Sequence, residues 1–459
     1  MALLSAETRR DAIDLIRLAG PISVTFLSSY FITLTELTII GRLGVVELAA
    51  VGLSFDLIVI FELLGIGLLT TLTVLCTQAL ARGDERRAAV VLRSGILVTA
   101  ILGTIGMVWI AMVPQLMQLT GQGGQVIVAA KTYVVAVIIS IIPGLLGETV
   151  SSLASARGPK MLNRVALIWA VGVLVNIPLT WFMVLGFGGV GGWGLTGAGL
   201  SRVLIGSAIV ACEFYFCGVW QVVMKRKGEF LPWLTWQEFK STAQQILHQG
   251  LPVALSFMFE FTMFVAIGLM IGRFGADWLA ANKMVVSVLE LAFFLNVSLG
   301  YAGMIRITAI REDHSVGLRN RLRRIGLVTL GLAMCPMAVF IVLMEFFPRF
   351  IIGFFIDLDR VENHSAIAAA ISLFAIAGVF QLADTVQSVS SRLLRGFADT
   401  RWPMVFALSG YWLVGIGGGL LVGHYFQLPA LLWWALAAGL SLVAALMSGR
   451  FWLLSGRAV

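Results

Sequence analysis

Residues 40–50 read IGRLGVVELAA, and residues 271–281 read IGRFGADWLAA; seven of the eleven positions are identical. The shift of 231 residues between them also aligns Pro21 with Pro252, without a gap. A second pair of similar segments, at 156–158 and 394–396, lies later in each copy. The sequence therefore predicts an internal duplication, in which one structural unit occurs twice.

Both copies are unusually apolar. Hydrophobic residues make up 59% of the 459 residues and charged residues only 12%, about half of what is usual in a soluble domain. Apolar runs long enough for a helix to cross a bilayer, which takes about 20 residues, recur along the whole chain. We therefore predict an all-α polytopic membrane protein with twelve transmembrane helices in two pseudo-symmetric six-helix bundles. The predicted spans are residues 18–39, 48–78, 89–113, 126–154, 162–185, 195–223, 247–271, 277–305, 324–347, 365–391, 403–423 and 428–454.

The predicted domains are an N-terminal bundle at 1–223, a cytoplasmic amphipathic linker at 224–246 and a C-terminal bundle at 247–459. Because six is an even number, both bundles enter the membrane with the same orientation, an arrangement that places a substrate path between repeats. Most of the 32 Lys and Arg residues lie at the N-terminus or after even-numbered spans, which predicts that both termini are cytoplasmic. The same excess of basic loops explains the net charge of +8 without nucleic acid.

Carboxylates inside predicted spans are the candidate functional groups, because an ionised acid at mid-bilayer costs about 2.5–3.5 kcal/mol and usually faces a bundle interior or a cavity. Glu36 ends a polar stripe in the first span, and Asp384 lies within a polar face in the tenth. The residues that share these faces are Thr25, Ser29 and Thr33 with Glu36, and Gln381, Gln387, Ser388 and Ser391 with Asp384. The acid of the seventh span, Glu260, has apolar and polarizable neighbours instead.

The fifth span adds oxygen donors. Asn176 and Thr180 are four residues apart with Pro178 between them, so a freed backbone carbonyl and two side chains could coordinate a hard cation such as Na⁺. A simple proline kink accounts for this pattern nearly as well. Four further acids within predicted spans are Asp56, Glu62, Glu148 and Glu290, whose roles the sequence leaves open; Glu290 is kept as a secondary candidate with Gln381 and Gln387.

Several motifs of the chain resemble those of the MATE (multidrug and toxic compound extrusion) family, in particular its NorM branch. They are Asn176-Ile177-Pro178, Gly250-Leu251-Pro252, Phe259-Glu260-Phe261-Thr262, Asp384-Thr385-Val386-Gln387, Leu394-Arg395-Gly396 with Asp399-Thr400, and Tyr411-Trp412. The resemblance covers nearly the whole chain. The family more often has Asp at the position of Glu36 and Asn at that of Thr180, and it lacks an acid at Glu290.

The resemblance implies an antiporter in the bacterial plasma (inner) membrane that exports small cationic and amphipathic drugs or dyes by alternating access, driven by inward Na⁺ or H⁺. Cation-coupling positions of the family correspond to Glu36, Glu260 and Asp384, with Asn176 and Thr180 nearby, and Na⁺ would bind at Asp384 and Glu260. Membrane lipids are the expected surroundings. We expect a monomer that needs no cofactor besides the coupling ion.

Two other classes of protein fit the sequence less well than an antiporter. A flippase-type exporter of the same superfamily, for a lipid-linked precursor, would need a more cationic cavity, and Arg202 is the best candidate for an intramembrane base. An enzyme would need a catalytic cluster, yet the four His residues lie at span ends and no nucleotide-binding loop is present.

Overall fold

The computed structural model describes residues 6–119, 123–187, 190–224, 234–312, 317–356, 358–426 and 428–457. Twelve helices in these ranges are long and apolar enough to cross a membrane, which confirms the predicted all-α polytopic class. Helices are the expected form, because a helix satisfies its own backbone hydrogen bonds where water is absent. The chain folds into two compact units, Val24–Ala254 (here the N-terminal unit) and Met1–Ser23 with Leu255–Val459 (the C-terminal unit). The predicted division at residues 223 and 247 stays a prediction.

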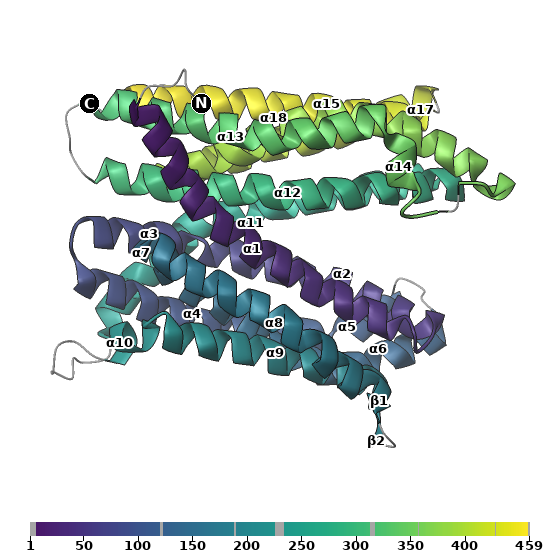
Figure 1. Ribbon diagram of the computed structural model, residues 1–459, viewed down its shortest axis with the longest axis horizontal. Coiled ribbons are helices and arrows are strands. Elements are labelled where there is room, and N and C mark those ends of the chain that lie inside the picture. The colour runs from purple at the N-terminus through teal and green to yellow at the C-terminus, as the bar shows by residue number, and fades with distance from the viewer. Residues whose placement is uncertain are drawn as a thin grey trace. The chain divides into compact units, whose positions relative to one another are not determined.

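Most of the helices that Figure 1 colours purple to blue-teal belong to the N-terminal unit. Its elements are the later part of α1 (Ala6–Ile40), α2 (Val45–Leu69), α3 (Thr71–Ala81), α4 (Glu85–Ala111), α5 (Val113–Leu119), α6 (Gly124–Val137), the short 3-10 helix η1 (Ile138–Ser140), α7 (Ile141–Arg157), α8 (Pro159–Leu185), β1 (Gly186–Phe187), β2 (Val190–Gly191), α9 (Gly194–Phe216), α10 (Val219–Met224) and the start of α11 (Trp236–Gly272). Strands β1 and β2 form a two-stranded antiparallel hairpin that the sequence did not predict.

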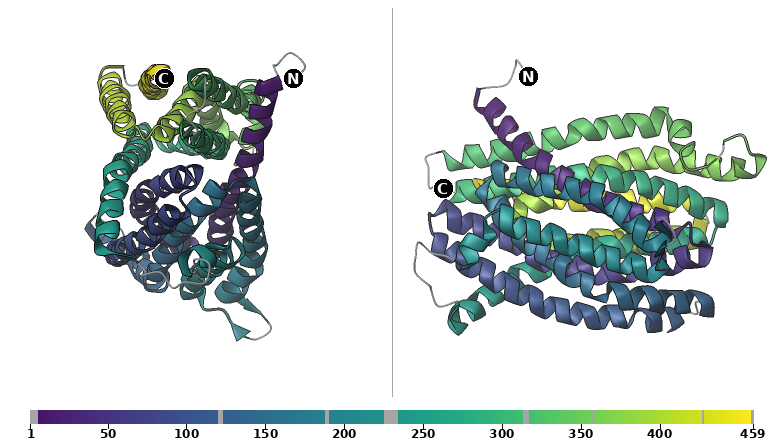
Figure 2. Two further views of the ribbon diagram at one scale, coloured as in Figure 1. Left: turned by 90° about the vertical axis from the view of Figure 1, so that its left-hand side faces the viewer. Right: turned by 60° about the horizontal axis from the view of Figure 1, so that its bottom comes forward.

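The C-terminal unit holds the rest of α11 and the later helices. These are α12 (Ala276–Arg311), α13 (Leu318–Phe346), α14 (Pro348–Ile352), the 3-10 helix η2 (Val361–Asn363), α15 (His364–Gly396), α16 (Arg401–Ala407), the π-helix η3 (Leu408–Ile416), α17 (Gly417–Phe426) and α18 (Pro429–Arg457). Helix α15 packs against α12, α13 and α18, so it is the central helix of this unit. The long helices of the unit run roughly parallel, as the left view of Figure 2 shows end on.

Helices α1 and α11 each contribute to both units. The change of unit follows Ser23 in α1 and Ala254 in α11, two residues after Pro21 and Pro252 respectively. These positions are equivalent under the shift of 231 residues, from 21 to 252, that the sequence repeat defines. The duplication is therefore visible in the helices and not only in the sequence.

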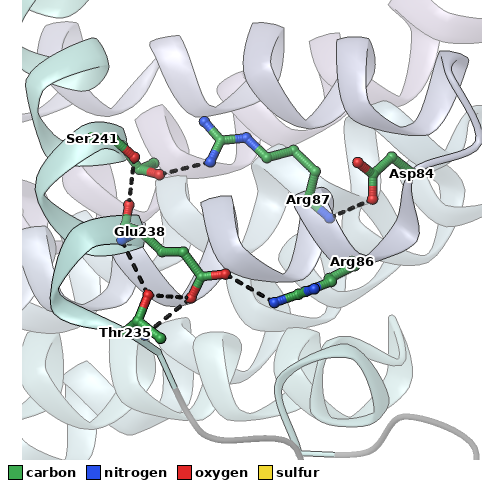
Figure 3. Close-up of polar contacts among 7 residues, drawn as sticks. Asp84, Arg86, Arg87, Thr235, Glu238 and Ser241 are labelled. Atoms are coloured by element: carbon green, nitrogen blue, oxygen red, sulfur yellow. Dashed lines mark hydrogen bonds and ion pairs between the residues drawn. The ribbon is translucent and has the colours of Figure 1, made fainter.

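The first turn of α11 is fixed to α4 by polar contacts. Thr235 and Glu238 form a capping box: the Glu238 carboxylate accepts from the backbone N–H of Thr235 at 3.0 Å and from its hydroxyl at 2.8 Å. Arg86 of α4 donates to the other carboxylate oxygen of Glu238 at 3.2 Å (Figure 3). Next to it, Asp84 caps α4 through the backbone N–H of Arg87 at 2.8 Å. Residues 236–246 of the predicted linker are thus the beginning of α11, whereas residues 225–233 lie outside the described residues.

Helices α2 and α11 approach closely where both carry glycine. A Cβ atom added to Gly250 would lie 2.6 Å from the carbonyl oxygen of Leu68, and one added to Gly67 would lie 2.7 Å from the backbone nitrogen of Ala254. Any larger side chain would separate the two backbones. Glycine at these two positions therefore sets the distance between the helices.

Helix α15 is longer than the predicted span at 365–391, because it continues to Gly396. Arg392 and Arg395, which count as loop residues in the predicted topology, lie on this added turn and are each only 4% exposed. Two cations are therefore buried in the C-terminal unit at positions where the sequence suggested a solvated loop.

Candidate functional site

A polar face of α15 lies buried in the C-terminal unit. Asp384 is 6% exposed, and the side chains one or two turns away on the same face are buried as well. These neighbours are Gln381, Gln387, Ser388 and Ser391. The helical spacing in the sequence is enough to identify this face, since all five side chains project from one side of a helix.

Three buried amide oxygens have no hydrogen-bond partner within the described part of the chain: Gln381 Oε1 and Gln387 Oε1, on the helix face of Asp384, and Asn296 Oδ1 on α12. The Asn296 amide is held on α12, where its nitrogen donates to the Thr385 hydroxyl at 3.1 Å. Roughly 90% or more of buried polar groups in proteins have a partner, so three unpaired amide oxygens on or next to one polar helix face are unusual. Carboxylate and amide oxygens are the ligands of hard cations, and this set of donors fits such a cation.

Glu260 approaches this region from α11 and is half-buried. Its carboxylate interacts electrostatically with that of Asp384, and both carboxylates lie within electrostatic reach of the Arg392 guanidinium. Glu290, on α12, is exposed. The structure thus brings Asp384, Glu260 and the two glutamines together in one unit, and it keeps Glu290 off the buried face.

The buried arginines of α15 are held mainly by the hydroxyls of their own helix and by aromatic rings. Arg392 donates to the Ser388 hydroxyl at 2.7 Å and lies 5.4 Å from the ring centre of Tyr301. Arg395 donates to the Ser391 hydroxyl at 3.3 Å and lies 4.8 Å from the ring centre of Phe257. Three of their N–H nitrogens, Arg392 Nε and Arg395 Nε and Nη1, have no acceptor among the described residues. The C-terminal unit therefore combines two acids with two bases.

In the N-terminal unit, Glu36 has a partner on each carboxylate oxygen. Tyr133 of α6 donates its hydroxyl to Oε1 at 2.8 Å, and Arg202 of α9 donates from Nη1 to Oε2 at 3.1 Å. The other terminal nitrogen of Arg202 lies 3.7 Å from Oε1 of Glu62 on α2. The Phe55 ring completes this environment, with its centre 4.3 Å from the guanidinium carbon. Glu36 is thus a buried, ion-paired carboxylate.

Asn176 and Thr180 lie together on α8 and link it to two other helices. The Thr180 hydroxyl donates to Asn176 Oδ1 at 3.1 Å and lies 3.2 Å from the Ser201 hydroxyl on α9. The Asn176 amide nitrogen donates to the backbone carbonyl of Ile32, one turn before Glu36, at 3.5 Å. The predicted pair is therefore next to the Glu36 cluster along α1 and α9, and its polar groups are satisfied by each other.

A further buried acid, Glu213 on α9, escaped the sequence analysis. It is fully buried and accepts from Trp169 Nε1 at 2.7 Å and from the Ser151 hydroxyl at 3.2 Å. Its charge also interacts with that of Glu148 on α7. Glu213 could have been found from the sequence, because it is an acidic residue inside the predicted sixth span at 195–223.

Arg202, Tyr133 and Glu62 were also missed as neighbours of Glu36. They come from three helices, α9, α6 and α2, and no pattern in one helix shows which side chains meet across a bundle. The sequence does place one base, Arg202, and two acids, Glu36 and Glu62, within predicted spans. Charged residues inside a membrane usually pair with one another, so an ion pair among them could have been predicted.

Comparison with known proteins agrees with the repeat and the fold. The MatE family model matches residues 21–182 and again 252–421, and the two matches start at the prolines that the repeat aligns. The chain is 28% identical over 454 residues to "Multidrug resistance protein NorM" of Burkholderia vietnamiensis, covering 96% of this chain and 94% of the relative. It is 30% identical over 460 residues to "Probable multidrug resistance protein NorM" of Mesorhizobium japonicum, with coverage of 96% and 94%. One similar solved structure is described as the outward-facing conformation of a multidrug resistance MATE family transporter of the MOP superfamily. Its TM-score is 0.84 at 16% sequence identity, and the alignment covers 98% of this chain and 96% of the other chain.

Proposed function

The chain belongs to the MatE family of membrane transporters, and from that premise we propose that it is a multidrug efflux antiporter driven by an inward cation gradient. Its substrates are organic cations and amphipathic drug-like compounds; the names of its bacterial relatives, which state multidrug resistance, support drugs as the substrate class. It works as a monomer in the bacterial plasma membrane, with both termini in the cytoplasm, as the distribution of Lys and Arg supports.

The observation that carries this proposal is the set of oxygens around Asp384. A proton needs only one carboxylate, whereas Na⁺ takes several oxygen ligands at once. Asp384 with the unpaired oxygens of Asn296, Gln381 and Gln387 offers one carboxylate and three carbonyl groups. This donor set favours Na⁺ as the coupling ion, with Glu260 as the second carboxylate of the site.

Coupling requires that the ion and the drug favour different conformations, because a ligand shifts an equilibrium only by its difference in affinity between the two states. Na⁺ at Asp384 would neutralise a buried charge and so stabilise one state. A drug that binds the other state more tightly would stabilise that state instead. Binding of the ion and binding of the drug then oppose each other, although the two ligands contact different carboxylates.

A second candidate is an exporter of a lipid-linked precursor with an anionic headgroup. The specific observation in its favour is the unpaired N–H groups of Arg392 and Arg395. Against it, the Glu260 and Asp384 carboxylates lie within electrostatic reach of Arg392 and would repel a pyrophosphate.

The test is counterflow in proteoliposomes with Na⁺ and H⁺ gradients imposed separately. We expect ethidium to be exchanged when a Na⁺ gradient is imposed, and to a much smaller extent with a pH gradient alone. Transport driven only by the pH gradient would contradict Na⁺ coupling. Absence of dye transport under either gradient would contradict the antiporter and favour the lipid exporter.

A further inference from the structure

The ion-paired cluster of the N-terminal unit divides two roles between two acids. We propose that Arg202 is a tethered counterion that permanently occupies Glu36, and that Glu62 is the carboxylate that recognises the positive charge of the transported organic cation. The inference deepens the proposed function and rests on it, since it concerns the same class of substrate. It makes Arg202 a specificity-determining residue.

The first step is that Glu36 is nearly buried and already paired on both carboxylate oxygens. Its side chain is 3% exposed, and each carboxylate oxygen already has a donor, Tyr133 at 2.8 Å on one side and Arg202 at 3.1 Å on the other. A charged partner fixed to the backbone is at a very high effective concentration, so a free organic cation competes with it poorly. Removing one partner of a buried pair is strongly unfavourable, which keeps the pair closed.

The second step is that the Arg202 guanidinium is itself fixed in place. Arg202 lies on α9, and its guanidinium contacts two other helices. Glu36 on α1 and both Glu62 and Phe55 on α2 provide these contacts. The Phe55 ring lies 4.3 Å from the guanidinium carbon, within the range of a cation–π interaction. The arginine therefore cannot move away from Glu36 without losing several contacts at once.

The third step is the net charge of the cluster. Among the described residues, its charged groups are Glu36, Glu62 and Arg202, which act on one another, while the Tyr133 phenol is neutral because it donates its hydroxyl to Glu36. Two carboxylates and one guanidinium leave one negative charge in excess. Because Glu36 is closely paired, this excess belongs to Glu62.

Glu62 is also the accessible acid of the two. Its side chain is 23% exposed, against 3% for Glu36, and its contact with Arg202 at 3.7 Å is too long for a strong hydrogen bond. A partly exposed carboxylate with a weak internal partner can gain a second, external cation. The neighbouring Phe55 ring offers an apolar surface for the same ligand.

The experiment measures binding of tetraphenylphosphonium, a lipophilic cation without hydrogen-bond donors, to the full-length protein in detergent. Three variants are compared with the unaltered chain: Glu62→Gln, the double variant Glu36→Gln with Arg202→Gln, and Arg202→Gln alone. We expect Glu62→Gln to bind about fivefold more weakly, which is the scale of a partly exposed charge contact. The double variant keeps the net charge of the cluster and should bind within about twofold of the unaltered protein.

Arg202→Gln alone should bind tetraphenylphosphonium more tightly, because it frees the Glu36 carboxylate, and adding Glu36→Gln should reverse that gain. A purely structural arginine would not produce a gain in affinity. If Arg202→Gln fails to fold, Glu62→Gln and the double variant still decide the matter, provided that their melting temperatures stay near that of the unaltered protein.

Unchanged affinity in Glu62→Gln would overturn the inference. So would a double variant that loses as much affinity as Glu62→Gln, because Glu36 would then be the substrate ligand. No binding by the unaltered protein would contradict the proposed substrate class itself, a result distinct from either of these.

Discussion

At the scale of single residues, the C-terminal unit holds three buried amide oxygens without a donor among the described residues. Asn296 and Asn282 illustrate the difference, because both are buried asparagines on α12. The Asn282 side-chain oxygen accepts from Trp433 Nε1 at 3.1 Å, whereas that of Asn296 has no donor in the described structure. One amide is therefore structural, and the other is available to a cation.

We expect Asn296→Ala to raise the Na⁺ concentration needed for half-maximal ethidium transport by about tenfold, which corresponds to the loss of about 1.4 kcal/mol of ion binding. Asn282→Ala is the matched control and should lower the melting temperature without changing the Na⁺ requirement. The measurement is dye transport in proteoliposomes over a range of Na⁺ concentrations. Equal shifts in both variants would mean that Asn296 acts only through stability.

Which residues form the two candidate sites could be predicted from the sequence only in part. Asp384, Gln381 and Gln387 share one helix, so their spacing is enough to place them on one face. Asn296 joins them from α12 and Glu260 from α11, and such meetings depend on packing that no periodicity encodes. For the same reason Glu36 was predictable as a buried acid, but its partners Tyr133 and Arg202 were not.

At the scale of the elements, the twelve spans follow from hydropathy because each must cover the apolar thickness of a bilayer. Their ends were less predictable. Helix α15 continues past its apolar segment, since Arg392 and Arg395 are stabilised by serines one turn earlier on the same helix and by aromatic rings. A rule based on hydropathy ends a helix at the first charged residues, and here those residues are buried.

The closest approach between α2 and α11 gives a prediction about packing. Gly250→Ala should lower the melting temperature by several degrees, because the new methyl group would lie 2.6 Å from the Leu68 carbonyl oxygen and overpacking costs about 1–3 kcal/mol. Gly144→Ala, in α7, is the matched control: nothing lies within 4 Å of its new methyl group, and alanine is favoured over glycine in a helix by about 1 kcal/mol. Thermal unfolding in one detergent measures both. A Gly250→Ala variant as stable as Gly144→Ala would contradict the described packing.

At the scale of the whole molecule, the repeat predicted two similar units, yet their charged sites differ. The N-terminal unit pairs Glu36 and Glu62 with one arginine, while the C-terminal unit places Glu260 and Asp384 near two. Duplication conserved the helices and the prolines at 21 and 252, and the polar side chains diverged within that frame. The fold could thus be predicted from the repeat, but the different sets of charged side chains in the two copies could not.

Cells that lack their own efflux pumps should become more tolerant of ethidium and similar cationic dyes when they produce this protein. The acids within the two units favour cations, and the many aromatic side chains (29 Phe and 13 Trp) allow varied shapes. Growth at increasing dye concentration is the measurement, with the membrane content of the protein checked by immunoblot. Unchanged tolerance in cells that contain the protein in their membranes would contradict the proposed export of cations.

The most direct test of the central claim compares Asp384→Asn with Glu290→Gln in ethidium efflux from energised membrane vesicles, normalised to the amount of protein. Asp384 is buried on a helix face that also carries the unpaired oxygens of Gln381 and Gln387, whereas Glu290 is exposed on α12. The account predicts that Asp384→Asn abolishes ion-driven efflux while protein level and detergent stability stay near normal, and that Glu290→Gln retains at least partial transport. Full activity in Asp384→Asn, or loss of transport only in Glu290→Gln, would contradict it.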